Sequence, residues 1–156
     1  MSTSTDTASD PRVDVRGPRF AAWVTTGVLV ATLVLSAVSP LAAAVLLGAQ
    51  TVVFAIGARR GPRRHPYGIV FGRVIAPRLG PVTDREPAGP LKFAQLVGFV
   101  FAAVGTVGFA AEWSAVGLIA TAFALFAAFL NAAFGICLGC KLYPLATRLR
   151  RVPTPA

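Results

Sequence analysis

Cys137 and Cys140 are the only cysteines in the chain, and Leu138 and Gly139 lie between them. Two thiols at this spacing can exchange with a partner's disulfide, carry a persulfide or ligate a metal, or they can pack as small apolar side chains. They cannot join distant parts of the chain, as the disulfides of secreted domains do. We therefore predict a redox or sulfur-carrying pair, with metal ligation and plain packing as alternatives.

Lys141 follows the pair directly. On a continuous helix it lies one turn after Cys137, where its cation favours the thiolate, so it is a candidate thiolate stabiliser. Gly139 and Pro144 indicate that the helix loosens or ends here. A helix that ends before the cysteines opposes a thiolate through its dipole, whereas a new short helix that begins at Cys137 favours it. The sequence leaves both arrangements open.

Few other side chains are available for a metal or for catalysis. Structural zinc usually takes four ligands, and the single histidine, His65, stands between Arg64 and Pro66 in a polar stretch where we expect a solvated surface position. We therefore predict no bound metal and no cofactor. The chain also lacks a nucleophile elbow, a nucleotide-binding glycine loop and paired carboxylates. If the protein is an enzyme, thiol-disulfide exchange is the chemistry that the residues offer.

The composition indicates a membrane protein. Hydrophobic residues make up 55% of the 156 residues and charged residues only 13%, about half the charged fraction of a soluble domain. The formal charge of +9 comes from basic residues between apolar runs, without the basic, aromatic-bearing face that binds nucleic acid. We therefore predict no nucleic-acid partner.

Four uncharged apolar runs are each about long enough to cross some 30 Å of hydrocarbon as a helix. Short corners at Ser39-Pro40 and Glu112-Trp113 join them in pairs. The prediction is an all-α integral membrane protein with four transmembrane helices in two hairpins. The chain begins with a polar segment at 1–19, which we expect to be disordered over 1–10, and ends with a tail at 149–156. One membrane domain covers 20–148. Its spans lie at about 20–39, 41–58, 93–111 and 114–136, and its basic loop lies at 59–92.

The positive charges predict the orientation. Of fifteen Lys and Arg residues, three precede the first span, eight lie in the loop at 59–92 and four follow the last span. By the positive-inside rule, the chain is a multi-pass plasma-membrane protein with both termini and the loop in the cytoplasm. The basic loop is expected to contact anionic headgroups of the bilayer. The cysteine pair then lies at the reducing, cytoplasmic face, where a disulfide is transient.

Three polar side chains, Gln50, Gln95 and Asn131, interrupt the apolar runs. Such groups usually hydrogen-bond between helices, and a polar path for a small substrate is the alternative. On a regular helix Asn131 is rotated away from both cysteines.

Several blocks together resemble a known family. They are Asp14-Val-Arg-Gly-Pro-Arg-Phe20, His65-Pro-Tyr-Gly68, Pro77-Arg-Leu-Gly-Pro81, Phe93-Ala-Gln-Leu-Val-Gly98 and Leu130 to Tyr143, which carries a Cys-x-Gly-Cys-x-x-Tyr motif. From about Asp14 to Arg148 the chain resembles a family of small four-span bacterial membrane proteins of unknown function. Members are often encoded beside, or fused to, rhodanese-type sulfurtransferases and thioredoxin-like proteins. The resemblance implies sulfur or thiol traffic at the membrane, with a partner of one of these kinds.

The residues and the resemblance together predict a membrane component of thiol-disulfide or sulfane-sulfur handling. Two alternatives come from other classes of protein. One is a subunit that transports a small sulfur anion such as thiosulfate, and the other is a membrane scaffold for a sulfurtransferase or thioredoxin-like partner.

Overall fold

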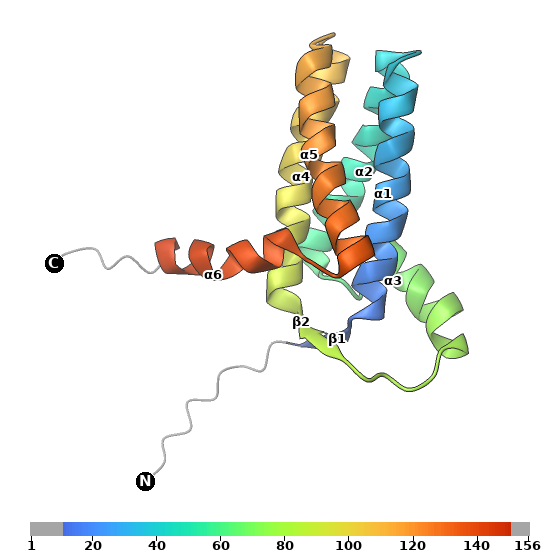
Figure 1. Ribbon diagram of the computed structural model, residues 1–156, viewed down its shortest axis with the longest axis vertical. Helices are drawn as coiled ribbons and strands as arrows, with labels where there is room; N and C mark the ends of the chain where they lie inside the picture. Colours follow the sequence, from blue (N-terminus) through green and yellow to red (C-terminus); the bar gives the residue numbers. More distant parts are fainter. Residues whose placement is uncertain (1–10, 151–156) are drawn as a thin grey trace, which may run out of the picture.

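The computed structural model describes residues 11–150, which form a bundle of four long helices (Figure 1). All four are long and apolar enough to cross a membrane, since 21 residues of helix span about 30 Å. The prediction of an all-α membrane protein with four spans in two hairpins is therefore confirmed. The predicted disorder of residues 1–10 and the tail residues 151–156 lie outside the described part. The long helices are α1 (Arg16–Ser36), α2 (Pro40–Arg60), α4 (Ala88–Ala110) and α5 (Ser114–Phe134).

The helix ends follow local rules. The Ser39 hydroxyl accepts a hydrogen bond from the N–H of Ala42 at 3.2 Å and Pro40 takes the first helical position of α2, both common at helix starts. Helices α1 and α4 begin before the predicted spans because the basic residues flanking the apolar runs are themselves helical. Helix α5 ends at Phe134, before the predicted 136, because Gly135 adopts a left-handed conformation with φ of 68°.

Helix α2 packs closely against α4, with side chains of one helix over glycines of the other. A Cβ atom at Gly98 would lie 2.7 Å from a ring carbon of Phe54, and one at Gly105 would lie 2.7 Å from a methyl group of Leu47. The residues are seven apart on each helix, so they meet on successive repeats of one antiparallel face. Small residues of this kind allow membrane helices to approach closely.

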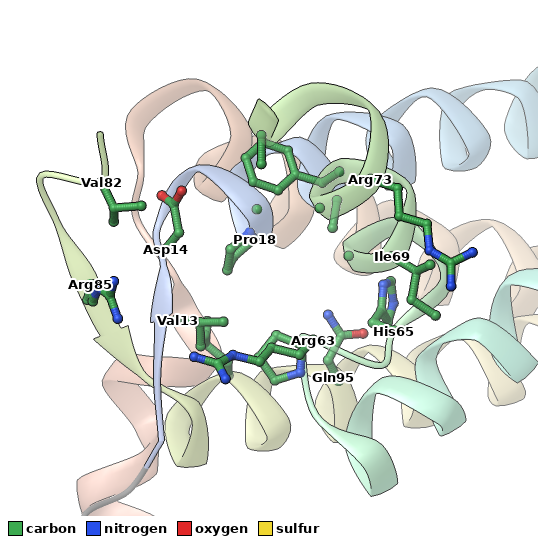
Figure 2. Close-up of a pocket in the computed structure, with 18 residues that line it drawn as sticks. Val13, Asp14, Pro18, Arg63, His65, Ile69, Arg73, Val82, Arg85 and Gln95 are labelled. Atoms are coloured by element: carbon green, nitrogen blue, oxygen red, sulfur yellow. The ribbon is translucent and has the colours of Figure 1, made fainter. Parts of the chain in front are cut away.

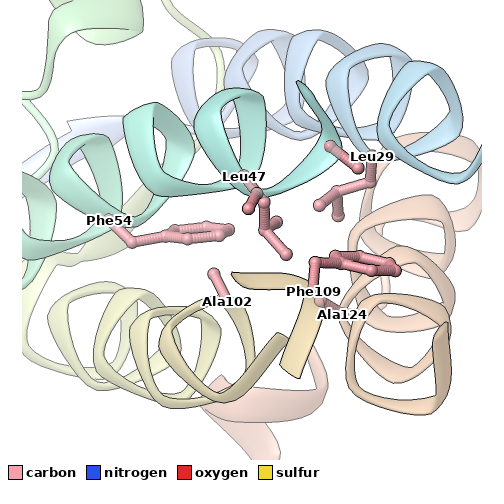
Figure 3. Close-up of a cluster of buried hydrophobic side chains, with 8 residues drawn as sticks. Leu29, Leu47, Phe54, Ala102, Phe109 and Ala124 are labelled. Atoms are coloured by element: carbon pink, nitrogen blue, oxygen red, sulfur yellow. The ribbon is translucent and has the colours of Figure 1, made fainter. Parts of the chain in front are cut away.

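The same face continues into the buried core of the bundle, shown in Figure 3. Leu29 of α1 and Leu47 of α2 are fully buried there, and Phe109 of α4 is 1% exposed. The cluster contains residues from all four long helices: Leu29, Ala43, Ala44, Leu47, Phe54, Ala102, Phe109 and Ala124.

The shorter elements all lie at one end of the bundle, and the two tight hairpin turns lie at the other (Figure 1). This end also carries every Lys and Arg of the described residues, in the short elements, in the turn between α2 and α3 or at the adjoining ends of the long helices. The short elements are β1 (Arg12–Asp14), α3 (Pro66–Val70), the π-helix η1 (Phe71–Ile75), the 3-10 helix η2 (Ala76–Arg78), β2 (Arg85–Pro87) and α6 (Leu138–Arg150).

Strands β1 and β2 form a small antiparallel ladder that the sequence did not predict. Val13 pairs with Glu86, and the N–H of Ala88 donates to the carbonyl of Pro11 at 3.1 Å. The ladder joins the residues before α1 to those before α4.

The middle of the basic loop is helical in α3 and η1. Its anchor is Phe71, which is 6% exposed. The Phe71 ring lies over Gly17 and 5.9 Å, centroid to centroid, from the ring of Phe20. The loop therefore packs onto the start of α1.

The contact between α4 and α5 provides a test of the packing. A Cβ atom at Gly108 would lie 2.6 Å from the backbone nitrogen of Gly117, so Gly108→Ala must push the helices apart and should lower the free energy of unfolding by about 1–3 kcal/mol. At Gly27 a Cβ atom meets nothing within 4 Å, so the control Gly27→Ala should be neutral or stabilising by up to about 1 kcal/mol. Unfolding in mixed detergent measures both, and equal stability of the two variants would contradict the packing.

Candidate functional site

The cysteine pair lies where the chain leaves α5 and begins α6. Helix α5 closes at Gly135, where the N–H of Ile136 donates to the carbonyl of Leu130 at 3.2 Å. Helix α6 then starts at Leu138, which makes Cys137 the residue that caps it. Of the two arrangements that the sequence left open, the structure has the new short helix.

Two hydrogen bonds tie Cys137 to the first turn of α6. Its carbonyl accepts the N–H of Lys141 at 3.1 Å, and its Sγ accepts the N–H of Cys140 at 3.2 Å. The two sulfur atoms are joined as a disulfide. In the reduced chain the same N–H group and the helix dipole favour a thiolate at Cys137. Lys141 is exposed and contacts Cys137 through its backbone.

Helix α6 is held against α4 by a contact that leaves no room for a side chain. A Cβ atom at Gly139 would lie 2.5 Å from the Cα atom of Ala94. One turn further along α6, the ring of Tyr143 lies 6.0 Å from that of Phe93. Glycine between the cysteines therefore sets how closely the pair approaches the bundle.

A cavity of about 360 Å³ extends from Cys137 between α1, α4, α5 and α6, and we call it the cysteine pocket. Most of its wall is apolar, and Gln95 and Asn131 are its polar amide side chains. The expectation that Asn131 lies away from the cysteines holds for a regular helix and is wrong here. The break at Gly135 turns the chain back, so Asn131 and Cys137 line one cavity.

A second cavity, of about 560 Å³, lies at the basic end of the bundle, and we call it the histidine pocket (Figure 2). His65 and Gln95 lie beside each other on one wall, and Asp14 lies on the opposite side. Hydrogen bonding with Arg16 holds the pKa of Asp14 below its usual range. Three arginines, Arg63, Arg73 and Arg85, also line this pocket.

The expectation that His65 is a surface residue is wrong. Its side chain is 2% exposed, and it lies over Gly57, where a Cβ atom would stand 2.6 Å from the imidazole Cδ2. Burial lowers the pKa of His65 to about 4, while the Gln95 side chain acts in the opposite direction. The imidazole is therefore neutral at pH 7, and its Nε2 atom has no hydrogen-bond partner.

Tyr67 connects the basic loop to the interior of the bundle. Its hydroxyl donates to Oε1 of Gln50 at 2.7 Å, and Gln50 is 1% exposed. Burial raises the pKa of Tyr67, which keeps the hydroxyl protonated as a donor. Gln50 was expected to bond between spans, and its partner instead comes from the loop. The His-Pro-Tyr-Gly block was the only sequence signal of this contact.

The two pockets adjoin. Pro18, Ala21, Leu91 and Gln95 line both. Gln95 thus stands between His65 on one side and the cavity of Cys137 on the other, and its Oε1 atom is buried on the His65 side, 2.9 Å from a Cβ atom placed on Gly57.

Comparison with known families identifies the family of this chain. Residues 13–148 match the family described as "Domain of unknown function (DUF4395)". The chain belongs to the DUF4395 family. No curated protein and no solved structure matches it significantly.

Metal ligation by the cysteines was one alternative, and the described part of this DUF4395 chain does not assemble a site for it. Within residues 11–150, no three His, Cys, Asp or Glu side chains cluster closely enough to hold a metal ion. His65 lines the histidine pocket and Cys137 lines the cysteine pocket, so the two cysteines and the histidine do not face one cavity.

The buried imidazole predicts a pH dependence of stability in this DUF4395 protein. The pKa of His65 is about 4 when folded and about 6.5 when unfolded, so the unfolded chain binds the extra proton as the pH falls through this window. The free energy of unfolding should therefore drop by about 2 kcal/mol between pH 7 and pH 5. Detergent unfolding at both pH values measures this drop.

The variant His65→Gln should lose most of this drop, and Arg73→Gln, at an exposed residue of the same pocket, should keep it. An equal drop in His65→Gln and the natural chain would show that another group is responsible.

Proposed function

We propose that this DUF4395 protein is a membrane component of thiol-disulfide or sulfane-sulfur handling. The observation that supports it is the pairing of Cys137 with Cys140 at the start of α6, where Sγ of Cys137 accepts a backbone N–H. The first turn of a helix is a favourable position for a reactive thiolate.

In the reduced protein the Cys137 thiolate attacks one sulfur of a partner's disulfide. The partner's S–S bond breaks, a mixed disulfide forms and the partner's other sulfur leaves as a thiolate. The Cys140 thiolate then attacks the Cys137 sulfur, which closes the intrachain disulfide and releases the partner reduced by two electrons.

With a persulfide, the same thiolate takes the outer sulfur and leaves the partner as a thiol. Attack by Cys140 on the Cys137 sulfur then releases hydrosulfide. We infer that Cys137 attacks and Cys140 resolves, because the N–H donor faces Cys137.

The orientation and partners are part of the proposal. The cysteines share the end of the bundle that carries the basic residues, which the positive-inside rule assigns to the cytoplasm, beside anionic headgroups. A rhodanese-type or thioredoxin-like protein in the cytoplasm is then the expected partner.

The transport and scaffold alternatives make different demands. A path for a thiosulfate-like anion requires a polar cavity. The cysteine pocket reaches Asn131 but is mostly apolar. Gln50 lines neither the cysteine pocket nor the histidine pocket. A scaffold does not require the cysteines, so serine at both positions should leave its partner binding and activity intact.

The assignment of Cys137 as the attacking residue predicts unequal reactivity. At pH 7, Cys137 in the Cys140→Ser variant should be alkylated by iodoacetamide several-fold faster than Cys140 in the Cys137→Ser variant, because only Cys137 receives the N–H donor. Mass spectrometry over time measures both rates. The reverse order would assign the attack to Cys140.

The proposed function is tested by the redox state of the pair in cells. Acid quench followed by mass-tag alkylation, before and after supplying thiosulfate or a mild thiol oxidant, should show a reversible change to disulfide or persulfide. A membrane-impermeant maleimide should label the reduced pair only after permeabilisation if the pair is cytoplasmic. Thiols that stay reduced and unmodified throughout would exclude the relay.

A further inference from the structure

The cysteine pocket extends from the disulfide into the membrane-spanning part of the bundle. Along α4 its wall continues beyond Ala94, which lies against Gly139, as far as Phe101, a further distance of about 10 Å along the helix. At the level of Phe101 the wall is aromatic, because this ring stacks on Phe123 of α5 with centroids 5.8 Å apart. One end of the cavity therefore lies at the cysteine pair and the other lies between helices long enough to span a membrane.

Two residues of the pocket wall are also exposed on the outer surface of a membrane-spanning helix. Phe123 and Phe126 line the pocket, and each is 58% exposed on a helix long enough to span the membrane. The exposed surface of a spanning helix faces hydrocarbon, so a molecule that enters between α4 and α5 must be lipid-soluble and uncharged.

Two amide side chains provide polar contacts beside the disulfide. Gln95 and Asn131 line the pocket with Cys137, and each amide carries two N–H donors. A ligand with carbonyl oxygens can accept hydrogen bonds from these donors, whereas a plain acyl chain cannot.

We propose that the cysteine pocket binds the ring of a lipid-soluble quinone, which accepts two electrons from Cys137 and Cys140. The inference rests on the proposed function, with the exchange running in the direction in which a partner's thiols reduce the pair, and it names the acceptor of the electrons that the pair then carries. A flat ring suits the aromatic wall, the two ring oxygens suit the two amides, and about 360 Å³ lies within the usual range for ligand pockets.

The step is balanced without a further reactant. Two S–H bonds break and one S–S bond forms between Cys137 and Cys140. The two electrons and two protons pass to the two quinone oxygens, which become the hydroxyl groups of the hydroquinone. Thiols oxidised by the pair in the aqueous phase would thereby supply electrons to a carrier in the lipid.

The experiment uses the full chain, reduced and desalted, in nanodiscs of quinone-free lipid. A benzoquinone with every ring position substituted and one decyl chain is added, since a fully substituted ring resists direct addition of thiols. Mass-tag alkylation measures disulfide formation and ultraviolet absorbance measures hydroquinone. The expected result is one hydroquinone for each disulfide formed. Oxidised glutathione, supplied in separate samples, reports thiol exchange from the aqueous side.

Two substitutions on α5 form a matched pair. Ala127 lines the pocket, so Ala127→Phe fills it, whereas Ala122 is exposed on the same helix outside the pocket. The ratio of the quinone rate to the glutathione rate should fall about tenfold or more in Ala127→Phe, because the phenyl ring takes up volume that the quinone ring needs. The ratio should be unchanged in Ala122→Phe. Gln95→Leu, which removes the amide at similar size, should also lower the ratio and serves if Ala127→Phe fails to fold.

The outcomes separate the two proposals. If the quinone oxidises the pair and both pocket variants slow this oxidation, the quinone site is supported. Exchange with oxidised glutathione without any reaction with the quinone, or an unchanged ratio in the pocket variants, overturns the quinone site and leaves the thiol relay in place. A pair that reacts with neither oxidant overturns both.

Discussion

The close approach of α2 and α4 is the constraint on which the basic end of the molecule depends. In lipid, helices gain little from hiding apolar surface, so van der Waals contact at short range holds them together. Phe54 over Gly98 and Leu47 over Gly105 provide that contact. The same pair of helices carries Gly57 and Gln95, which enclose His65, so the packing of the spans also determines where the loop can be buried.

The position of the cysteines depends on two further glycines with different physical roles. Gly135 adopts a left-handed conformation with φ of 68°, which other residues adopt only at a cost of about 1 kcal/mol. Gly139 matters for its lack of a side chain against Ala94. The first glycine turns the chain out of α5 and the second seats α6 on α4. Together they place the cysteine motif at the start of a new helix, beside a cavity.

The spans were predictable because an uncharged run of about 20 residues has few stable alternatives to a membrane helix. The pairing into hairpins followed from two corners too short for anything else. The burial of His65 was not predictable, because its polar sequence neighbours indicate solvent and the residues that cover it, Gly57 and Gln95, belong to different spans.

The candidate site was predictable in its parts and not in its assembly. The sequence singled out Cys137, Gln95 and Asn131 separately. That they line one cavity depends on the break at Gly135 and on the register of α4 against α5, which no local pattern encodes. The ladder of β1 and β2 was missed for a similar reason, since each strand is only three residues long and their partners lie far apart in the chain.

That ladder has a mechanical consequence. Its backbone hydrogen bonds tie the start of α1, in one hairpin, to the start of α4, in the other. Many transporters alternate their access by rocking one half of a bundle against the other. Such a motion would have to break the hydrogen bonds of this ladder. The ladder therefore restrains the separation of the two hairpins at the basic end, so a molecule bound from the membrane would enter between two helices and not through a parting of the two halves.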